Sequence, residues 1–319
     1  MPAFPGGTDI EILERRELRF TRSTLFVCST DDPVYPSIAI KAYPNPPNMK
    51  GWLEYSANLG LSEALSPNAS LRALKVLGWT RQPATLWTEF VPGTDLHILL
   101  SDPARVLPPT EAENVRAWFA SAGHALRLYH TATKDPVLES LEIRATVAED
   151  LARLAKLVLR QGRYSDAFLR KQEVVKRYQD FDVHNLRVGD DARLYVLDPP
   201  TKDEYAFPHR DIGRFVVGIN RPMQTALWRP YGRRARELAV QFAQVFMDSY
   251  SEGCRISGAA SDHRQLIAIY EMSRQVLRIR SAVRDRRLTR VYMHLRLLRR
   301  AREITAGETA DASDQDSVR

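Results

Sequence analysis

The period of the hydrophobic pattern changes near residue 95, and this change restricts the possible folds more than any other feature. Before it, runs such as ELRFTRSTLFVCST, SIAIKAYP, LRALKVLGWT and ATLWTEFV alternate β-branched and aromatic residues with other types, as strands do. One stretch among them, MKGWLEYSANLGLSEAL, places Trp52, Tyr55 and Leu59 at roughly helical spacing. The first part of the chain is therefore predicted to run β-β-β-α-β-β.

From Thr110 onward the pattern is helical. In TEAENVRAWFASAGHALRLYH the apolar residues recur three and four places apart, and Thr110 followed by Glu113 predicts a capping box. A second helix is predicted in IRATVAEDLARLAKLVLRQG, ending at Gly162. Two short strands around the turn GDDA follow, and helices resume beyond Asp211.

These patterns predict an α+β chain with two lobes. Residues 1–95 are expected to form a small β-rich N-lobe, and residues 96–303 a larger helical C-lobe that includes the GDDA hairpin. Residues 304–319 are polar and are expected to be a disordered tail.

Composition places the chain among ordinary globular proteins. It has 319 residues, of which 44% are hydrophobic and 27% are charged. No run approaches the ~18 apolar residues of a membrane span, and the N-terminus lacks an apolar signal core, so we expect a cytoplasmic protein. Cys28 and Cys254 lie far apart in the sequence without metal-ligand spacing, and both are expected to be reduced.

The net charge of +7 is unevenly distributed, because the segment from Arg274 to Arg302 consists mostly of arginine and aliphatic residues. One interpretation is a last helix whose apolar stripe, from Val276 to Leu298, covers the core while its arginines are solvated. The other is a surface that contacts anionic lipid at the membrane periphery or binds a phosphorylated or glycolipid substrate. The sequence has no zinc-finger spacing and no RNA-recognition signature, which argues against a nucleic-acid partner.

Lys41 lies on the strand SIAIKAY, where its side chain should face opposite to Ile38 and Ile40. A lysine in this position is ordinarily solvated surface. A functional role requires a carboxylate from the following helix that fixes the ammonium where it can meet a phosphate. Glu54 is the first candidate for that carboxylate, and Glu63 is the second.

Asp180, Asn185 and Asp198 form the most suggestive polar set, in the segment RYQDFDVHNLRVGDDARLYVLDPP. Phosphoryl transfer needs a carboxylate that takes the proton of the attacking hydroxyl, and hard oxygen ligands for Mg²⁺. The spacing of these residues fits that need, but it also fits polar residues that cap turns. Asp182 and His184, which lie between them, are interpreted as loop residues without a catalytic role.

Together these segments resemble a known family. DFDVHN is similar to the catalytic loop of the aminoglycoside phosphotransferase and choline kinase-like family, which has the protein-kinase-like fold, and VLDPP is similar to its metal-binding aspartate segment. IAIKAY resembles the phosphate-anchoring lysine strand, and WTEFVPGTDL resembles the linker between the lobes. GHALRLYH and RDIGRFV resemble two helical-lobe segments, and all the matches occur in family order from Lys41 to about Val217.

The resemblance implies a role for each matching residue. Asp180 would be the catalytic base, and Asn185 and Asp198 would be ligands of Mg²⁺. Lys41 would hold the phosphates of the nucleotide, with Glu54 as its ion-pair partner. The residues expected beside the adenine, contributing backbone hydrogen bonds, are Glu89, Phe90 and Val91.

The resemblance also gives His130 a structural role and implies that Asp211 orders the catalytic loop. The sequence departs from the family at three places, one of which is Pro199-Pro200 directly after Asp198. Tyr178-Gln179 stands where the family has His-Gly before the catalytic aspartate, and STDDPVYP, with its acidic Asp31 and Asp32, replaces a glycine-rich turn.

The sequence therefore predicts an ATP- and Mg²⁺-dependent phosphotransferase that moves the γ-phosphoryl group to a hydroxyl of a small molecule. The acceptor classes considered are a sugar, an amino alcohol, an antibiotic and a lipid-linked saccharide. The alternative is a catalytically impaired relative that binds a nucleotide as a scaffold or regulator, which the altered loop and the missing glycines favour.

Overall fold

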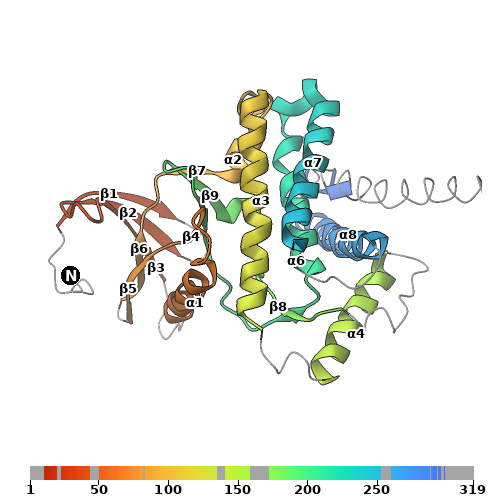
Figure 1. Cartoon of the computed structure of the whole chain (residues 1–319), viewed down its shortest axis with the longest axis horizontal. Helices are drawn as coiled ribbons and strands as arrows, with labels where there is room; N and C mark the ends of the chain where they lie inside the picture. Colours follow the sequence, from red (N-terminus) through yellow and green to blue (C-terminus); the bar gives the residue numbers. More distant parts are fainter. Residues whose placement is uncertain are drawn as a thin grey trace, which may run out of the picture. The chain divides into compact units, whose positions relative to one another are not determined.

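The structure is a computed structural model that describes residues 11–19, 23–43, 50–81, 83–134, 141–158, 172–252, 260–287, 289–292, 294, 295 and 298. The chain divides into two compact units. Unit 1 consists of Met1–Leu96 and His184–Asp203, and unit 2 consists of His97–Val183 and Glu204–Arg319. Unit 1 is rich in strands and unit 2 is mainly helical, which confirms the predicted α+β class with two lobes (Figure 1).

Unit 1 is built on a five-stranded antiparallel sheet with the strand order β1-β2-β3-β6-β5. Lys41 on β3 pairs with Leu25 on β2 and with Leu86 on β6, so it lies on the central strand of the sheet. The elements of this part are β1 (Ile12–Arg19), β2 (Thr24–Thr30), β3 (Ser37–Ala42), α1 (Lys50–Leu65), β5 (Val76–Arg81) and β6 (Ala84–Glu89).

A second sheet of unit 1 has the order β4-β10-β9-β7, in which β4 and β10 are parallel. Its strands are β4 (Leu71–Ala73), β7 (Gly93–Asp95), β9 (Leu186–Gly189) and β10 (Leu194–Val196). The prediction that LRALKVLGWT forms one strand was wrong, because β4 and β5 are separate strands in different sheets. Local alternation does not reveal that the partner of β4 comes more than a hundred residues later.

The GDDA hairpin formed by β9 and β10 has the predicted antiparallel pairing, but it groups with unit 1 although it was expected in the lobe of residues 96–303. β9 also pairs with β7, and Arg187 on β9 contacts Asp95 at 2.6 Å and donates to the carbonyl of Val91 at 3.1 Å. These long-range contacts bring the polar residues at the two ends of the hairpin into the same unit as Lys41.

The two faces of β3 pack against different groups. Ile38 and Ile40 are buried in a cluster with Cys28 and Leu77. Lys41 belongs to the opposite face, as its parity predicted. Cys28 forms no disulfide, whereas Cys254 lies outside the described residues.

Unit 2 is mainly helical, and in Figure 1 its helices α3 and α7 run side by side. A Cβ at Gly123 of α3 would overlap the carbonyl oxygen of Phe246 on α7, so only glycine permits this approach. The helices and strands from Leu96 onward outside the β9–β10 hairpin are α2 (Leu96–Ser101), α3 (Pro109–Ala132), α4 (Leu141–Val158), β8 (Val175–Lys176), β11 (Tyr205–Ala206), α6 (His209–Asn220), α7 (Gly232–Ser251) and α8 (Ala260–Arg284).

The predicted capping box at Thr110 was wrong. The structure begins α3 at Pro109, with Pro108 as N-cap residue and no side-chain cap hydrogen bond. Proline suits the first helical position because its fixed φ is helical and its missing N–H would have had no partner there, so the helix starts two residues earlier than predicted. The predicted helix end at Gly162 and the predicted disordered tail at residues 304–319 lie outside the described residues.

The arginine-rich C-terminal segment does not form the single apolar stripe that the sequence predicted. α8 ends at Arg284, and Arg286 has a φ of 54°, which breaks the helical course. Val283 and Leu295, two members of the predicted stripe, are 57% and 48% exposed. Among the described helices none is long and apolar enough to cross a membrane.

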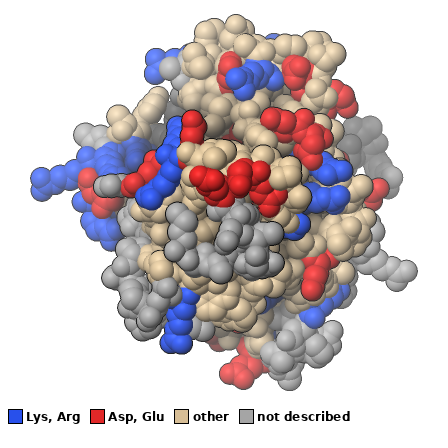
Figure 2. Space-filling view, turned by 90° about the vertical axis from the view of Figure 1, so that its left-hand side faces the viewer, with Lys and Arg blue, Asp and Glu red and all other residues tan. Residues whose placement is uncertain are grey.

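One face of the molecule carries both acidic and basic side chains. The face in Figure 2 shows acidic and basic side chains interspersed over the described surface.

Candidate functional site

Lys41 is the centre of the first polar cluster, which lies wholly in unit 1. Its ammonium contacts Oε2 of Glu54 at 2.8 Å and Oδ1 of Asp198 at 3.0 Å. The structure thus places Glu54 of α1, and not Glu63, beside the lysine. The Glu54 side chain is 7% exposed and that of Asp198 is 58% exposed, so one carboxylate anchors the lysine from the interior and the other faces solvent.

Tyr43 completes the anchoring of Glu54. Its hydroxyl donates to Oε2 of Glu54 at 2.6 Å, the same oxygen that accepts from Lys41. Burial, together with the charge of Glu54, raises the pKa of the Tyr43 hydroxyl, so it stays a donor at any physiological pH. Burial alone would lower the pKa of Lys41, but the charges of Asp198 and Glu54 raise it, so the lysine remains an ammonium.

Asn185 and Asp198 flank the β9–β10 hairpin. The N–H of Leu197 donates to the carbonyl of Asn185 at 2.8 Å, which continues the pairing of the two strands by one step. Asp198 follows directly and has a φ of 45°, an uncommon conformation for a residue before proline. Such backbone strain is retained where the surroundings fix it, and here the ion pair with Lys41 does so.

The chemistry of this donor set suits Mg²⁺ when a nucleotide supplies further ligands. Asn185 and Asp198 offer an amide oxygen and a carboxylate oxygen, which are hard donors of the kind that Mg²⁺ prefers. In the part of the chain that the structure describes, no group of three or more His, Cys, Asp and Glu residues could hold a metal without help. This agrees with the use of Mg²⁺ in phosphoryl transfer, where phosphates and water fill most positions.

The residues expected beside the adenine lie at the end of β6. The N–H groups of Glu89 and Phe90 donate to the carbonyls of Lys75 and Ser37 at 2.9 and 3.1 Å. The carbonyl of Val91 accepts from Arg187. These three backbone groups already have partners within the protein. Backbone hydrogen bonds to adenine are therefore expected from the other N–H and carbonyl groups of this segment.

The acidic first loop that replaces a glycine-rich turn uses its carboxylates locally. Oδ1 of Asp31 accepts from the N–H of Glu11 at 3.0 Å, and Oδ1 of Asp32 accepts from the N–H of Val34 at 2.7 Å. Asp32 therefore caps the turn that joins β2 to β3, as aspartate commonly does in turns, whereas Asp31 holds the residue that precedes β1.

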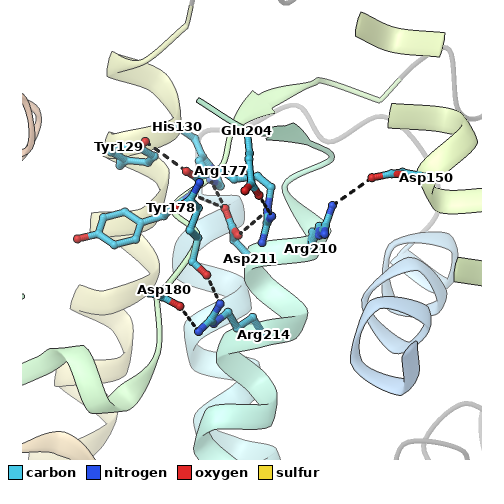
Figure 3. Close-up of polar contacts among 11 residues, drawn as sticks. Tyr129, His130, Asp150, Arg177, Tyr178, Asp180, Glu204, Arg210, Asp211 and Arg214 are labelled. Carbon is cyan, nitrogen blue, oxygen red and sulfur yellow. Dashed lines mark hydrogen bonds and ion pairs between the residues drawn. The ribbon is translucent and has the colours of Figure 1, made fainter. Parts of the chain in front are cut away.

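Asp180 is the centre of the second polar cluster, which lies wholly in unit 2. Its side chain is 62% exposed, and Arg214 on α6 donates both to Oδ1 of Asp180 and to the carbonyl of Gln179 (Figure 3). The neighbours Tyr178 and Phe181 are fully buried and stack edge to face, with ring centroids 5.1 Å apart. The loop is thus anchored in the core on both sides of an exposed carboxylate.

The anchor of this loop continues into an aromatic core. Phe215 lies 5.2 Å from Phe181 and 4.2 Å from Phe246, measured between ring centroids, and Phe119 stacks on Phe242 at 5.1 Å. All of these side chains are buried, so the position of Asp180 rests on the packing of α3, α6 and α7.

Asp211 lies beneath the loop and is buried. Its Oδ2 accepts from the N–H of Tyr178 at 2.7 Å and from Nε2 of His130 at 3.2 Å (Figure 3). Nδ1 of His130 lies 2.9 Å from the hydroxyl of Tyr250. Burial alone would raise the pKa of Asp211, but the hydrogen bond and charge of His130, with Arg177 and the N–H of Tyr178, hold it below its usual value. An ionised Asp211 therefore fixes the backbone just before Gln179 and Asp180.

Sequence reasoning missed three members of these clusters. Tyr43 shares the face of Lys41 on β3, so the parity argument could have found it. Arg214 lies three residues after Asp211 on a helix, a spacing that puts both on one side. Arg177 contacts Asp211 at 3.6 Å and also pairs with Glu204. No sequence pattern predicts these contacts of Arg177.

No protein-family model and no curated protein matches this sequence. Solved structures nevertheless match over most of the chain. A glucosamine kinase has a TM-score of 0.57 at 15% identity, covering 94% of this chain and 80% of that one. The GDP complex of a variant aminoglycoside 2'-phosphotransferase-IIIa has a TM-score of 0.53 at 12% identity, covering 94% and 95%.

A choline kinase from Cryptosporidium parvum Iowa II matches with a TM-score of 0.50 at 12% identity, covering 98% of this chain and 94% of that one. At such identities the similarity concerns the fold. The chain has the two-lobed protein-kinase-like fold of these small-molecule kinases, as the sequence predicted.

Proposed function

We propose that this protein is a small-molecule kinase that transfers the γ-phosphoryl group of ATP to a hydroxyl of its acceptor. The observation that carries the proposal is the position of Lys41 between Glu54 and Asp198, 2.8 and 3.0 Å from their oxygens. A lysine fixed by a buried carboxylate, beside an exposed carboxylate suited to a metal, is an arrangement that phosphate binding requires. The kinase-like fold supports the same conclusion.

Each residue then has a definite task. Lys41 binds phosphate oxygens of the nucleotide, and Glu54, fixed by Tyr43, holds the lysine in position. Asn185 and Asp198 hold Mg²⁺, which when bound neutralises phosphate charge. The segment of Glu89, Phe90 and Val91 lies beside the adenine.

Asp180 acts on the acceptor. It orients the hydroxyl and accepts its proton as the hydroxyl oxygen bonds to the γ-phosphorus. The bond from that phosphorus to the bridging oxygen of ATP breaks, and the products are ADP and the phosphorylated acceptor. Asp211 contributes by holding the loop, through the N–H of Tyr178, and does not itself react.

A thermal-shift titration with ATP and Mg²⁺ tests the nucleotide part of the proposal. A ligand that binds only the folded state raises the melting temperature with its concentration. We expect a Mg²⁺-dependent rise that Asp198→Ala loses and that Asp191→Ala, a change at an exposed aspartate in the turn of the same hairpin, keeps. No rise at millimolar nucleotide would contradict the proposal.

One observation favours a second candidate, a nucleotide-binding scaffold without catalysis. Arg214 pairs with Asp180, the residue proposed to accept the proton, so a guanidinium group already occupies one oxygen of this carboxylate. The two candidates differ in turnover. Formation of ADP with a hydroxyl acceptor supports the kinase, whereas nucleotide binding without turnover of any acceptor supports the scaffold.

A further inference from the structure

Four arginines of unit 2 converge near Asp180 from two helices. Arg214 lies on α6 and Arg221 at its C-terminal cap, while Arg274 and Arg278 lie one turn apart on α8. We call these four residues the arginine cluster. The two helices approach closely, since a Cβ at Gly213 of α6 would lie 2.9 Å from the carbonyl oxygen of Ile267 on α8.

The members of the arginine cluster are close enough to repel one another. Burial lowers the pKa of Arg274 to about 9, and the charges of Arg214 and Arg278 act in the same direction. Burial and the charge of Arg221 likewise lower the pKa of Arg278. All four remain cations at neutral pH, so the protein holds a concentrated positive charge here.

His294, which lies next to the arginine cluster, adds no charge to it. Its Nδ1 lies 2.8 Å from Oε1 of Gln275. Burial, followed by the charges of Arg278 and Arg221, lowers the pKa of His294 to about 4, so it is neutral at physiological pH. The positive charge is therefore that of the four guanidinium groups.

Acidic side chains balance only part of this charge. Arg214 pairs with Asp180, and Arg274 lies 3.8 Å from Asp182. Within the described ranges, Arg221 and Arg278 have no carboxylate within ion-pair distance, and Nη1 of Arg274 is buried without a hydrogen-bond partner. Glycine at position 218 of α6 leaves the room in which Asp182 lies, because a Cβ there would be 2.6 Å from Oδ1 of Asp182.

We infer that the arginine cluster binds an anionic group of the acceptor, so that the substrate is a hydroxyl compound carrying a phosphomonoester. The inference rests on the proposed kinase function and specifies its substrate class. Guanidinium groups match phosphate oxygens in a bidentate manner, and several of them together favour a dianion over a carboxylate. A cationic amine in this place would meet like charge.

Location and charge support the assignment together. Arg214 contacts Asp180, and the charge of Asp180 also acts on Arg274, so two members of the cluster lie near the residue that would receive the hydroxyl proton. An acceptor whose phosphate contacts Arg274 and Arg278 can present its hydroxyl to Asp180.

The test compares glucose 6-phosphate with glucose, so that the probes differ by one phosphate. Inorganic phosphate serves as a minimal anion and choline as a cation. The full-length protein is titrated by thermal shift without nucleotide, as wild type and as Arg274→Gln, Arg274→Lys, Arg278→Gln and Arg280→Gln. Arg280 is an exposed arginine of the same helix and provides the matched control. Lys41→Ala reports any binding at the nucleotide cluster.

We expect glucose 6-phosphate and inorganic phosphate, but not glucose or choline, to raise the melting temperature. The apparent affinity should fall about tenfold or more in Arg278→Gln and Arg274→Gln, as expected when a charged hydrogen bond is lost. Arg274→Lys should retain part of the affinity for these phosphates. Arg280→Gln and Lys41→Ala should have the affinity of the wild type. Equal binding of glucose and its phosphate, loss in Lys41→Ala only, or equal loss in Arg280→Gln would overturn the inference.

Two further results separate this inference from the proposed function. If ATP and Mg²⁺ bind in a manner that depends on Asp198 while no phosphomonoester binds, the kinase proposal stands and the anionic acceptor is wrong. If Arg274 and Arg278 mediate binding to vesicles of anionic phospholipid and the protein does not bind glucose 6-phosphate, the inference of a soluble phosphomonoester acceptor is also wrong. Anion binding without any nucleotide binding would overturn the acceptor role together with the kinase.

Discussion

The two polar clusters use the same kinds of side chains but in opposite proportion. In unit 1 the single cation Lys41 lies between the two carboxylates of Glu54 and Asp198. In unit 2 the arginine cluster has four guanidinium groups, and among the described residues its ion pairs are those of Arg214 with Asp180 and of Arg274 with Asp182. An excess of carboxylate suits a ligand that brings a divalent cation, and an excess of guanidinium suits an anion. The difference indicates that each cluster is complementary in charge to a different partner.

The clusters also differ in how they are held. The carboxylate of Glu54 is fixed directly by two donors, Lys41 and Tyr43. Asp180 is exposed, and its position is fixed indirectly, through the buried neighbours Tyr178 and Phe181 and through Asp211 beneath them. Substitutions in the unit 1 cluster should therefore affect nucleotide binding, and substitution of Asp180 in unit 2 should affect the catalytic step.

The largest effect is expected from Asp180→Asn. The amide cannot accept the hydroxyl proton, so kcat should fall by about 10²–10⁴, the range for loss of a general base. The nucleotide-induced thermal shift should be retained, because Lys41, Glu54 and Asp198 are unchanged. Asp198→Ala, which removes a proposed ligand of Mg²⁺, should instead lose the thermal shift. Measurements of ADP formation and of melting temperature on both variants decide, and a variant Asp180→Asn with unchanged kcat would remove the proposed base.

The next effect concerns stability. Asp211→Ala leaves Arg177 and His130 without their buried carboxylate, and loss of one partner of a buried ion pair costs about 3–5 kcal/mol. Urea unfolding at neutral pH measures this loss. Glu237→Ala, which removes an exposed carboxylate paired with Arg233 on α7, is the control and should change stability little. Equal effects of the two changes would mean that the catalytic loop does not depend on Asp211.

The stability from Asp211 should depend on pH in a definite direction. The pKa of this carboxyl is lower in the folded protein than its ordinary value of 3.8, so folding favours the ionised form. Its contribution is present above the ordinary pKa and is lost as the pH falls through the folded-state pKa. The difference in unfolding free energy between wild type and Asp211→Asn should therefore shrink as the pH is lowered below 3.8. A difference that grows on acidification would contradict the assignment.

Much of the unit 1 cluster followed from the sequence, and little of the arginine cluster did. Strand parity placed Lys41 opposite Ile38 and Ile40, and the helix that follows supplied Glu54. These predictions succeeded because a strand and the next helix are local and their periods are regular. The spacing of Asp180 and Asp198 suggested a polar set for phosphoryl transfer and the resemblance assigned their roles, but no local pattern gives their surroundings.

The failures have a physical cause in common. β4 was missed as a separate strand because its partner β10 lies far along the chain, and the start of α3 was misplaced because Pro109 competes with Thr110 for the first turn. The stripe of Val283 and Leu295 followed helical spacing, but the chain leaves the helix near Arg286. In each case a tertiary or capping interaction overrides a periodic pattern.

The smallest effect is expected from Tyr43→Phe. The change removes one of the two donors to Oε2 of Glu54 and leaves the contact with Lys41 in place. A hydrogen bond to a charged group contributes about 1.5–3 kcal/mol to stability, and only part of this should reach the ligand through the position of Lys41. The affinity for ADP and Mg²⁺ should therefore fall by less than about tenfold, which corresponds to 1.4 kcal/mol.

Isothermal titration of ADP measures this affinity in Tyr43→Phe and in the control Tyr55→Phe. Tyr55 is a tyrosine of α1 that packs against the same hydrophobic cluster as Tyr43. A larger loss than in Glu54→Gln would show that Tyr43 acts on the nucleotide directly, and equal values for the two tyrosine variants would show that the carboxylate needs only its lysine.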